Sequence, residues 1–165
     1  MEVEKSIDLI SSDNQKITIN EKACKKSKMI KNVLDDYPES TEIPCPKVKG
    51  SILAKIKEYL EHYMDVEEIK PIEKPLKSKE FKGCVNDEFD FTFMEVSIDD
   101  LFDIIEASNF LDIPPLQELA SAKVASIIKG TTSDEIRQEF NLQAEFTQEE
   151  ERAILEENKY NMENI

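Results

Sequence analysis

Apolar and polar residues alternate in the first twenty positions of the chain. Ile7 and Leu9 fall on odd positions, each preceded by a polar residue, and after a polar stretch at 12–15 Ile17 and Ile19 repeat the same period of two. This alternation is typical of a strand with one buried face, and the polar stretch supplies the turn between two such strands. The sequence therefore predicts a β-hairpin.

A helical period follows the hairpin. Residues 21–34 place Ala23, Ser27, Ile30 and Leu34 on one stripe, and residues 52–64 repeat this spacing with Ser51 as the expected N-cap. Between them, Ile43 lies among prolines, which suit only a short edge strand because proline cannot donate to a sheet. The order strand, strand, helix, short strand, helix predicts an α+β unit.

Residues 65–87 change in character, with prolines and lysines interspersed with glutamates. These features favour a solvated loop. A nucleic-acid-binding patch is the alternative, but the glutamates dilute the lysines and no arginine occurs here. The loop is the preferred interpretation.

Helical signals dominate the rest of the chain. One helix is expected to begin after Ser97 and another near Pro115, since proline suits the first turn of a helix. The second should end at Gly130. Two short helices are expected after the capping motifs at 132–135 and 147–150.

The last two predicted helices have few apolar positions. Ile136 and Phe140 belong to the first, and Ile154, Leu155 and Tyr160 to the second. Because isolated helices of this length are marginal in water, they must either pack on the rest of the chain or form a groove that a partner fills. The sequence leaves both options open.

Composition narrows the classes of function. The 165 residues include 21 Lys and Arg against 36 Asp and Glu, a net charge of −15 that disfavours binding to nucleic acid. No apolar run is long enough to span a membrane. Three cysteines at irregular spacing and the absence of a leader pattern predict an intracellular protein of the cytoplasm and nucleus.

The sequence gives no support for an enzyme. The three glycines are isolated, so no glycine-rich phosphate loop is present, and the single histidine, His62, makes a metal site improbable. No nucleophile is paired with a recognisable base. We therefore expect no cofactor, no metal and no catalytic residue.

Several short motifs recur in a distinctive order. Leu111-Asp-Ile113 is followed by Val124-Ala-Ser-Ile-Ile-Lys-Gly130 and then by Phe146-Thr-Gln-Glu-Glu-Glu151, while Ile30-Lys-Asn-Val-Leu-Asp-Asp36 lies in the first half. In these motifs the chain closely resembles the S-phase-kinase-associated adaptor family of SCF ubiquitin ligases. The resemblance extends over nearly the whole sequence.

The resemblance implies an α+β fold of the BTB/POZ type over residues 1–130, including the loop at 65–87, and a C-terminal helical extension at 131–165 that binds F-box proteins. It also implies a non-catalytic adaptor that bridges the N-terminal region of a cullin to F-box substrate receptors in ubiquitin-dependent degradation.

Site residues follow from the same resemblance. The cullin-binding positions match Pro46, Val48, Asn109 and Phe110, where phenylalanine replaces the usual tyrosine. The F-box-binding positions match Leu116, Leu119, Val124, Ile127, Ile128, Ile136, Phe140 and Tyr160. The chain has no tryptophan, so Tyr160 stands near the position of the family's C-terminal tryptophan.

Two other functions are kept as alternatives. One is a BTB-type module that self-associates without an F-box partner, although the helices after Thr131 argue against it. Weak homodimerisation of the free chain is left open. The other is a small acidic enzyme with an unrecognised carboxylate site.

Overall fold

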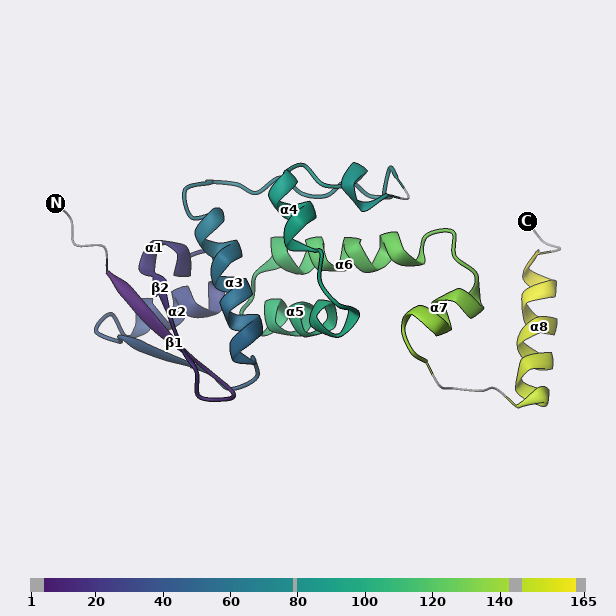
Figure 1. Ribbon diagram of the computed structural model, residues 1–165, viewed down its shortest axis with the longest axis horizontal. Helices are drawn as coiled ribbons and strands as arrows, with labels where there is room; N and C mark the ends of the chain where they lie inside the picture. The colour runs from purple at the N-terminus through teal and green to yellow at the C-terminus, as the bar shows by residue number, and fades with distance from the viewer. Residues whose placement is uncertain (1–4, 79, 143–146, 163–165) are drawn as a thin grey trace. The chain divides into compact units, whose positions relative to one another are not determined.

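The computed structural model describes residues 5–78, 80–142 and 147–162, with the side chains of 151 and 159–162 left out of the description (Figure 1). The chain separates into two compact units, Met1–Gly130 and Thr131–Ile165. We call them the N-terminal unit and the C-terminal unit and describe each by itself. Across the described ranges, no helix is both long and apolar enough to cross a membrane.

A three-stranded sheet begins the N-terminal unit. Strands β1 (Ser6–Ser11) and β2 (Lys16–Asn20) form the predicted hairpin, in which Ile7 lies opposite Ile19. Strand β3 (Glu42–Cys45) pairs in parallel with β1 and gives the order β2-β1-β3. The prediction of a short edge strand is confirmed, and the edge position explains why Pro44 is tolerated there.

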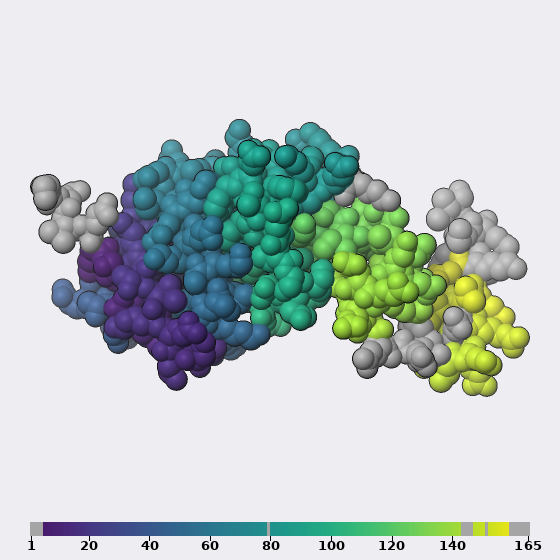
Figure 2. All heavy atoms as spheres, in the orientation of Figure 1, coloured from purple at the N-terminus to yellow at the C-terminus, as the bar shows by residue number. Residues whose placement is uncertain are grey.

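Helix α3 (Gly50–His62) packs against the sheet and also contacts helix α5 (Ile98–Phe110). In the space-filling view, the part of the chain coloured purple to teal, which belongs to the N-terminal unit, forms one continuous body (Figure 2). The side chains at the centre of this core are at most 1% exposed: Ile7, Leu9, Ile19, Ile30, Ile43, Leu53, Ile56 and Leu60. The α+β fold predicted from the sequence is therefore confirmed.

The start of α3 corrects one prediction. The helix begins at Gly50, one residue before the expected cap Ser51, and its N-cap residue Lys49 makes no side-chain cap. Instead, the Gly50 N–H donates to Asp13 Oδ1 in the hairpin turn, at 2.8 Å. Hydrogen bonds from the Ser11 hydroxyl and the Gly50 N–H hold the pKa of Asp13 below its usual value. A carboxylate far away in sequence therefore caps this helix.

The prediction of a single helix over residues 21–34 is wrong, because the chain forms two helices there. Helix α1 (Glu21–Cys24) ends before Ser27, and α2 (Lys28–Asp36) begins after it. The Ser27 hydroxyl accepts a hydrogen bond from the Ile30 N–H at 3.1 Å, as an N-cap does. Ser27 is thus buried as a cap residue and does not lie on a helical stripe.

The segment at 65–87 is less open than predicted. Phe81 begins a short 3-10 helix, η1 (Phe81–Gly83), and its side chain is 6% exposed, while Ile72 is 9% exposed. Helix α4 (Glu88–Phe93), which the sequence analysis missed, follows at once. These side chains pack on the core, so only part of the segment is solvated.

Helices α5 and α6 (Pro114–Ile128) pack against each other and are joined by a tight turn. Asp112 in this turn has φ of 50°, a left-handed conformation that aspartate tolerates better than most residues. The turn is fixed from outside, because the Lys28 N–H donates to the Asp112 carbonyl at 3.1 Å. The Ser27 hydroxyl donates to the adjacent Leu111 carbonyl.

Two helices make up the described part of the C-terminal unit, α7 (Ser133–Glu139) and α8 (Gln148–Met162). Thr132 and Glu135 form the predicted capping box at α7. At α8 the Glu150 carboxylate accepts from the Thr147 N–H at 2.9 Å, and the Thr147 hydroxyl accepts from the Glu150 N–H at 3.3 Å. Both helix starts were predicted from these motifs.

The Ser27→Ala substitution is expected to destabilise the N-terminal unit. It removes a helix cap and leaves the buried Leu111 carbonyl without the Ser27 donor, which should lower the free energy of unfolding by about 1–3 kcal/mol. Urea denaturation measures this loss. Ser51→Ala, at an exposed helix position, is the matched control, and equal effects of the two changes would contradict the role assigned to Ser27.

Candidate interaction surfaces

The described residues offer little chemistry for catalysis. Among them, no group of three or more His, Cys, Asp or Glu side chains is placed to hold a metal ion. Burial raises the pKa of Cys24 to about 12 and that of Cys45 to about 11. Both thiols therefore stay protonated at neutral pH and are poor nucleophiles.

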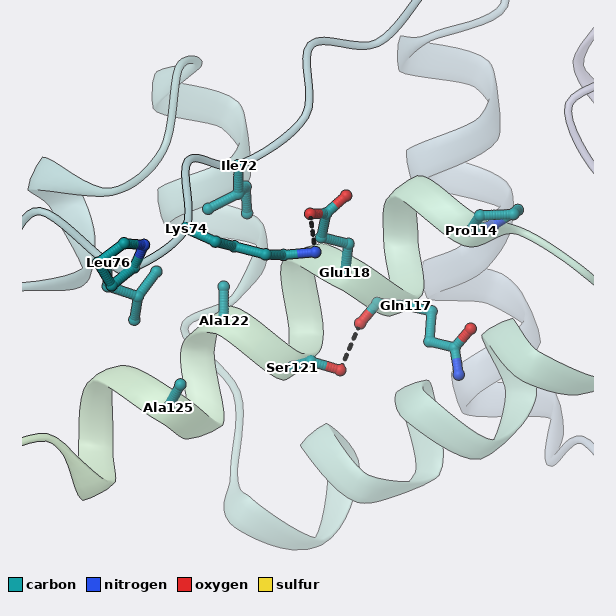
Figure 3. Close-up of a pocket in the computed structure, with 10 residues that line it drawn as sticks. Ile72, Lys74, Leu76, Pro114, Gln117, Glu118, Ser121, Ala122 and Ala125 are labelled. Atoms are coloured by element: carbon teal, nitrogen blue, oxygen red, sulfur yellow. Dashed lines mark hydrogen bonds and ion pairs between the residues drawn. The ribbon is translucent and has the colours of Figure 1, made fainter.

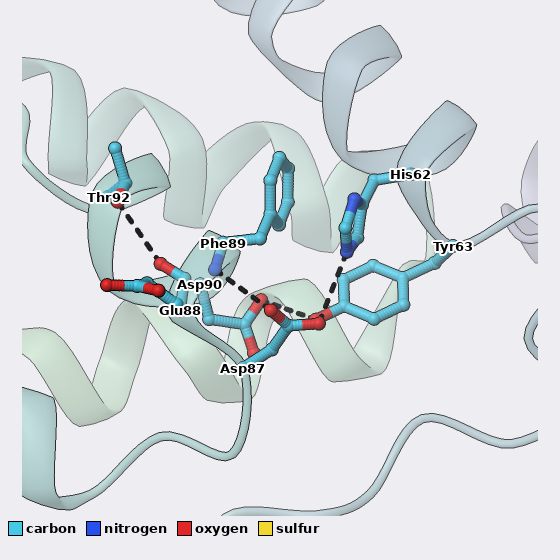
Figure 4. A network of polar contacts seen from close by, with 7 residues as sticks. All are labelled: His62, Tyr63, Asp87, Glu88, Phe89, Asp90 and Thr92. Carbon is cyan, nitrogen blue, oxygen red and sulfur yellow. Dashed lines mark hydrogen bonds and ion pairs between the residues drawn. The ribbon is translucent and has the colours of Figure 1, made fainter.

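The single histidine belongs to a polar and aromatic cluster between α3 and α4 (Figure 4). Its ring stacks on Phe89, with centroids 3.7 Å apart, and His62 Nε2 lies 3.3 Å from Asp87 Oδ2. Next to it, the Tyr63 hydroxyl donates to Asp90 Oδ1 at 2.7 Å. These contacts hold α4 against the end of α3, which is a structural role.

The pKa values of the two aspartates of this cluster are shifted in opposite directions. The Phe89 N–H and then His62 lower the pKa of Asp87. Burial raises the pKa of Asp90, and the hydrogen bond from Tyr63 only partly offsets this effect. Asp90 is 8% exposed, so the hydrogen bond from the Tyr63 hydroxyl stabilises a carboxylate that has lost most of its contact with water.

Three of the four predicted cullin-binding residues lie at one accessible place, which we call the Phe110 surface. Asn109 and Phe110 are the last two residues of α5, where Asn109 is exposed and Phe110 is half-buried. The turn that contains the exposed Pro46 lies beside them, because Lys47 Nζ is 5.8 Å from the centroid of the Phe110 ring. The Phe110 surface is defined by Pro46, Lys47, Asn109 and Phe110.

Val48, the fourth predicted residue, has a different position. Its side chain is 1% exposed and belongs to the core, while its carbonyl accepts from the Ser12 N–H at 2.8 Å. A salt bridge of 2.6 Å between Lys49 and Asp103 further links this turn to α5. Val48 therefore positions the turn, and its side chain is not accessible to a partner.

The predicted F-box-binding residues of α6 fall into two groups. Leu116 and Leu119 are at most 2% exposed and belong to the core of the N-terminal unit. Val124 and Ile127 are half-buried, and Ile128 is 40% exposed. Accessible apolar surface on this helix is thus concentrated toward its C-terminal end. Phe102 of α5, which is 44% exposed, was in neither predicted set, because both sets came from the resemblance to the adaptor family.

The C-terminal unit has no core among its described residues. Ile136 and Phe140 are half-buried, while Leu142 is 54% exposed and Leu155 is 64% exposed. Tyr160 lies in α8, but its side chain is outside the described part of the chain. A helical unit with this much exposed apolar surface is suited to burial against another protein.

Family models match both ends of the chain. Residues 5–65 match the model described as "Skp1 family, tetramerisation domain". Residues 114–160 match the model described as "Skp1 family, dimerisation domain". The two matches include the sheet with α1–α3 in the first half, and α6–α8 in the second.

Related proteins cover almost all of the sequence. An S-phase kinase-associated protein 1 homolog of Tetrahymena thermophila is 44% identical over 93% of this chain and 92% of its own length. Suppressor of kinetochore protein 1 of Schizosaccharomyces pombe is 39% identical, over 93% and 96%. The E3 ubiquitin ligase complex SCF subunit sconC of Arthroderma benhamiae is 40% identical, over 93% of each.

The Tyr63→Phe substitution tests the buried hydrogen bond to Asp90. Without the hydroxyl, the pKa of Asp90 in the folded state should rise further. The charged form of Asp90 would then destabilise the folded protein at neutral pH. We expect the free energy of unfolding to fall by about 1–3 kcal/mol at neutral pH. This loss should shrink as the pH is lowered towards 3.8, because protonated Asp90 carries no charge.

Urea denaturation at both pH values measures the effect. Tyr59→Phe is the matched control, because Tyr59 is 1% exposed and its ring lies 4.8 Å from that of Tyr63. The same pH-independent cost for both substitutions would rule out the Tyr63–Asp90 bond as the cause.

Proposed function

This chain belongs to the Skp1 family, and we propose that it is the non-catalytic adaptor subunit of an SCF-type ubiquitin ligase. In this role it bridges a cullin scaffold to F-box substrate receptors. The relative from Arthroderma benhamiae, itself named an SCF subunit, supports the proposal at 40% identity over 93% of both chains. The poor nucleophilicity of the buried thiols agrees with a protein that acts by binding.

The observation that carries the proposal is the C-terminal unit, in which no described residue is buried. Its helices begin at well-formed caps, yet Leu142 and Leu155 expose most of their apolar surface. An F-box segment that covers these side chains would bury the apolar surface that the described residues of the unit expose. Such burial contributes roughly 25 cal/mol per Å² of apolar surface.

The cullin is assigned to the Phe110 surface of the N-terminal unit. A half-buried aromatic ring flanked by exposed Asn109 and Pro46 is the kind of anchor that dominates protein interfaces. Lys47 beside the ring adds a positive charge at the edge of this surface. Substrate receptor and scaffold are thus held by different parts of one chain.

The Phe110→Lys substitution should weaken cullin binding selectively. It places a second positive charge beside Lys47 and forces an ammonium into an apolar contact, so we expect a loss of at least about tenfold in affinity for a cullin N-terminal fragment. Affinity for an F-box segment should change little. Isothermal titration calorimetry with each partner measures both values.

The control for this substitution is Tyr37→Lys. Tyr37 is 67% exposed at the end of α2, so it adds the same charge at another aromatic position. Equal losses of affinity for both partners with Phe110→Lys would contradict the separation of the two binding sites.

Truncation after Gly130 should have the reverse effect. It removes α7 and α8 at the boundary between the two units, so F-box affinity is expected to fall by at least tenfold while cullin affinity is retained. Circular dichroism should show that the N-terminal unit remains folded. A folded truncated chain that binds the F-box segment as tightly as the full chain would overturn the role given to the C-terminal unit.

A further inference from the structure

A groove on the N-terminal unit includes none of the residues of the Phe110 surface and none of those predicted to bind an F-box, although it is lined by the same helix, α6. The segment at 69–77 crosses α6 and leaves a cavity of about 510 Å³ between them (Figure 3). Ile72 and Leu76 line it from the segment, while Ala122 and Ala125 line it from the helix. We call this cavity the α6 groove.

Small side chains create the space. Glu118, Ala122 and Ala125 follow one another at helical spacing and so share one face of α6. The side chain of each alanine is a single methyl group, so the two alanines leave space between α6 and the segment at 69–77. Opposite them, Ile72 is 9% exposed and Leu76 is half-buried, so these two walls are apolar, while Gln117 and Ser121 add polar groups at the edge. The groove has room for a large apolar side chain.

An ion pair lies over this apolar space. Lys74 Nζ is 2.6 Å from Glu118 Oε1, and Figure 3 shows the lysine side chain extending from the crossing segment towards the helix. The Lys74 side chain is 75% exposed, and exposed pairs of this kind stabilise a protein little. A carboxylate from a partner could therefore replace Glu118 as the partner of Lys74 at small cost.

Positive charge is concentrated around the groove. Residues 69–78 carry three lysines against one glutamate, a net charge of +2, in a chain whose net charge is −15, and Lys77 is paired with Glu73. Lys129, directly after α6, donates to the Leu76 carbonyl, and Lys123 of α6 lies 4.9 Å from the centroid of the Phe81 ring. These two ammonium groups contact a carbonyl and a ring, so their charges attract an incoming anion.

We propose that the α6 groove binds a short acidic segment of a partner protein, in which a large apolar side chain is flanked by carboxylates. The apolar side chain enters between Leu76 and Ala125, and the carboxylates approach Lys74 and Lys129. The charge of the region selects an acidic partner, and the apolar walls select a peptide. Among the described residues that line the groove, none is aromatic and able to stack on a base, which disfavours single-stranded nucleic acid.

This inference uses none of the residues assigned to the cullin or to the F-box, so it stands or falls independently of the adaptor function. The probe is a fluorescein-labelled peptide of about twelve residues with a central Leu-Phe pair between glutamates. We expect it to bind the full chain with a Kd on the order of 100 µM, several-fold weaker at high salt. A peptide with serines in place of Leu-Phe should bind at least tenfold more weakly.

Two variants locate the binding site by fluorescence anisotropy. Ala125→Trp fills the groove, and Ala54→Trp at an exposed position of α3 is its control. Lys74→Glu reverses the charge, and Lys31→Glu at an exposed position of α2 is its control. Each groove variant should lower the affinity at least tenfold, and each control should change it less than twofold. Circular dichroism verifies that all four variants fold.

Three results would overturn the proposal. The first is no binding of the acidic peptide at millimolar protein. The second is equal binding of the serine peptide, or unchanged binding to Ala125→Trp, since either would reduce the interaction to surface charge. The third is tighter binding of a single-stranded oligonucleotide of the same charge, because the groove would then select a polyanion over a peptide.

Discussion

The buried hydroxyl of Ser27 connects two parts of the N-terminal unit that are distant in sequence. It caps α2 by accepting from the Ile30 N–H and donates to the Leu111 carbonyl at the end of α5. The turn fixed in this way follows Phe110 directly and leads into α6. The Lys28 and Met29 N–H groups donate to the same turn, at the Asp112 and Leu111 carbonyls. The start of α2 therefore supports both the end of α5, where Phe110 lies, and the start of α6.

Local signals explain which parts of the fold were predictable. The hairpin and the helix starts at Ser97 and Thr132 were predicted because alternation and capping motifs act over a few residues. The non-local features were missed. The Asp13 carboxylate caps α3 across 37 positions in the sequence. The Ser27 hydroxyl, which lies between α1 and α2, donates to the Leu111 carbonyl, 84 positions away. Helix α4 was missed because Phe89, Phe91 and Phe93 alternate with polar residues, a period of two that is typical of a strand and not of a helix.

The candidate site was predictable in part. The resemblance to the adaptor family indicated Phe110 and Pro46, but only the structure places Lys47 over the Phe110 ring. Apolar periodicity on α6 could not distinguish Leu116, which faces the core, from Ile128, which is exposed, since both follow the same helical spacing. The α6 groove was beyond sequence reasoning because it requires a segment predicted as a loop to lie across that helix.

The absence of buried side chains in the described C-terminal unit has a consequence for the survival of the chain in a cell. A protease can engage such helices by local opening, without the global unfolding that protects a packed domain. Cleavage there does not cut the N-terminal unit, because that unit ends at Gly130. A binding partner that covers these helices also shields them, so the lifetime of the intact protein rises with the supply of that partner. Unassembled copies are then the first to be removed.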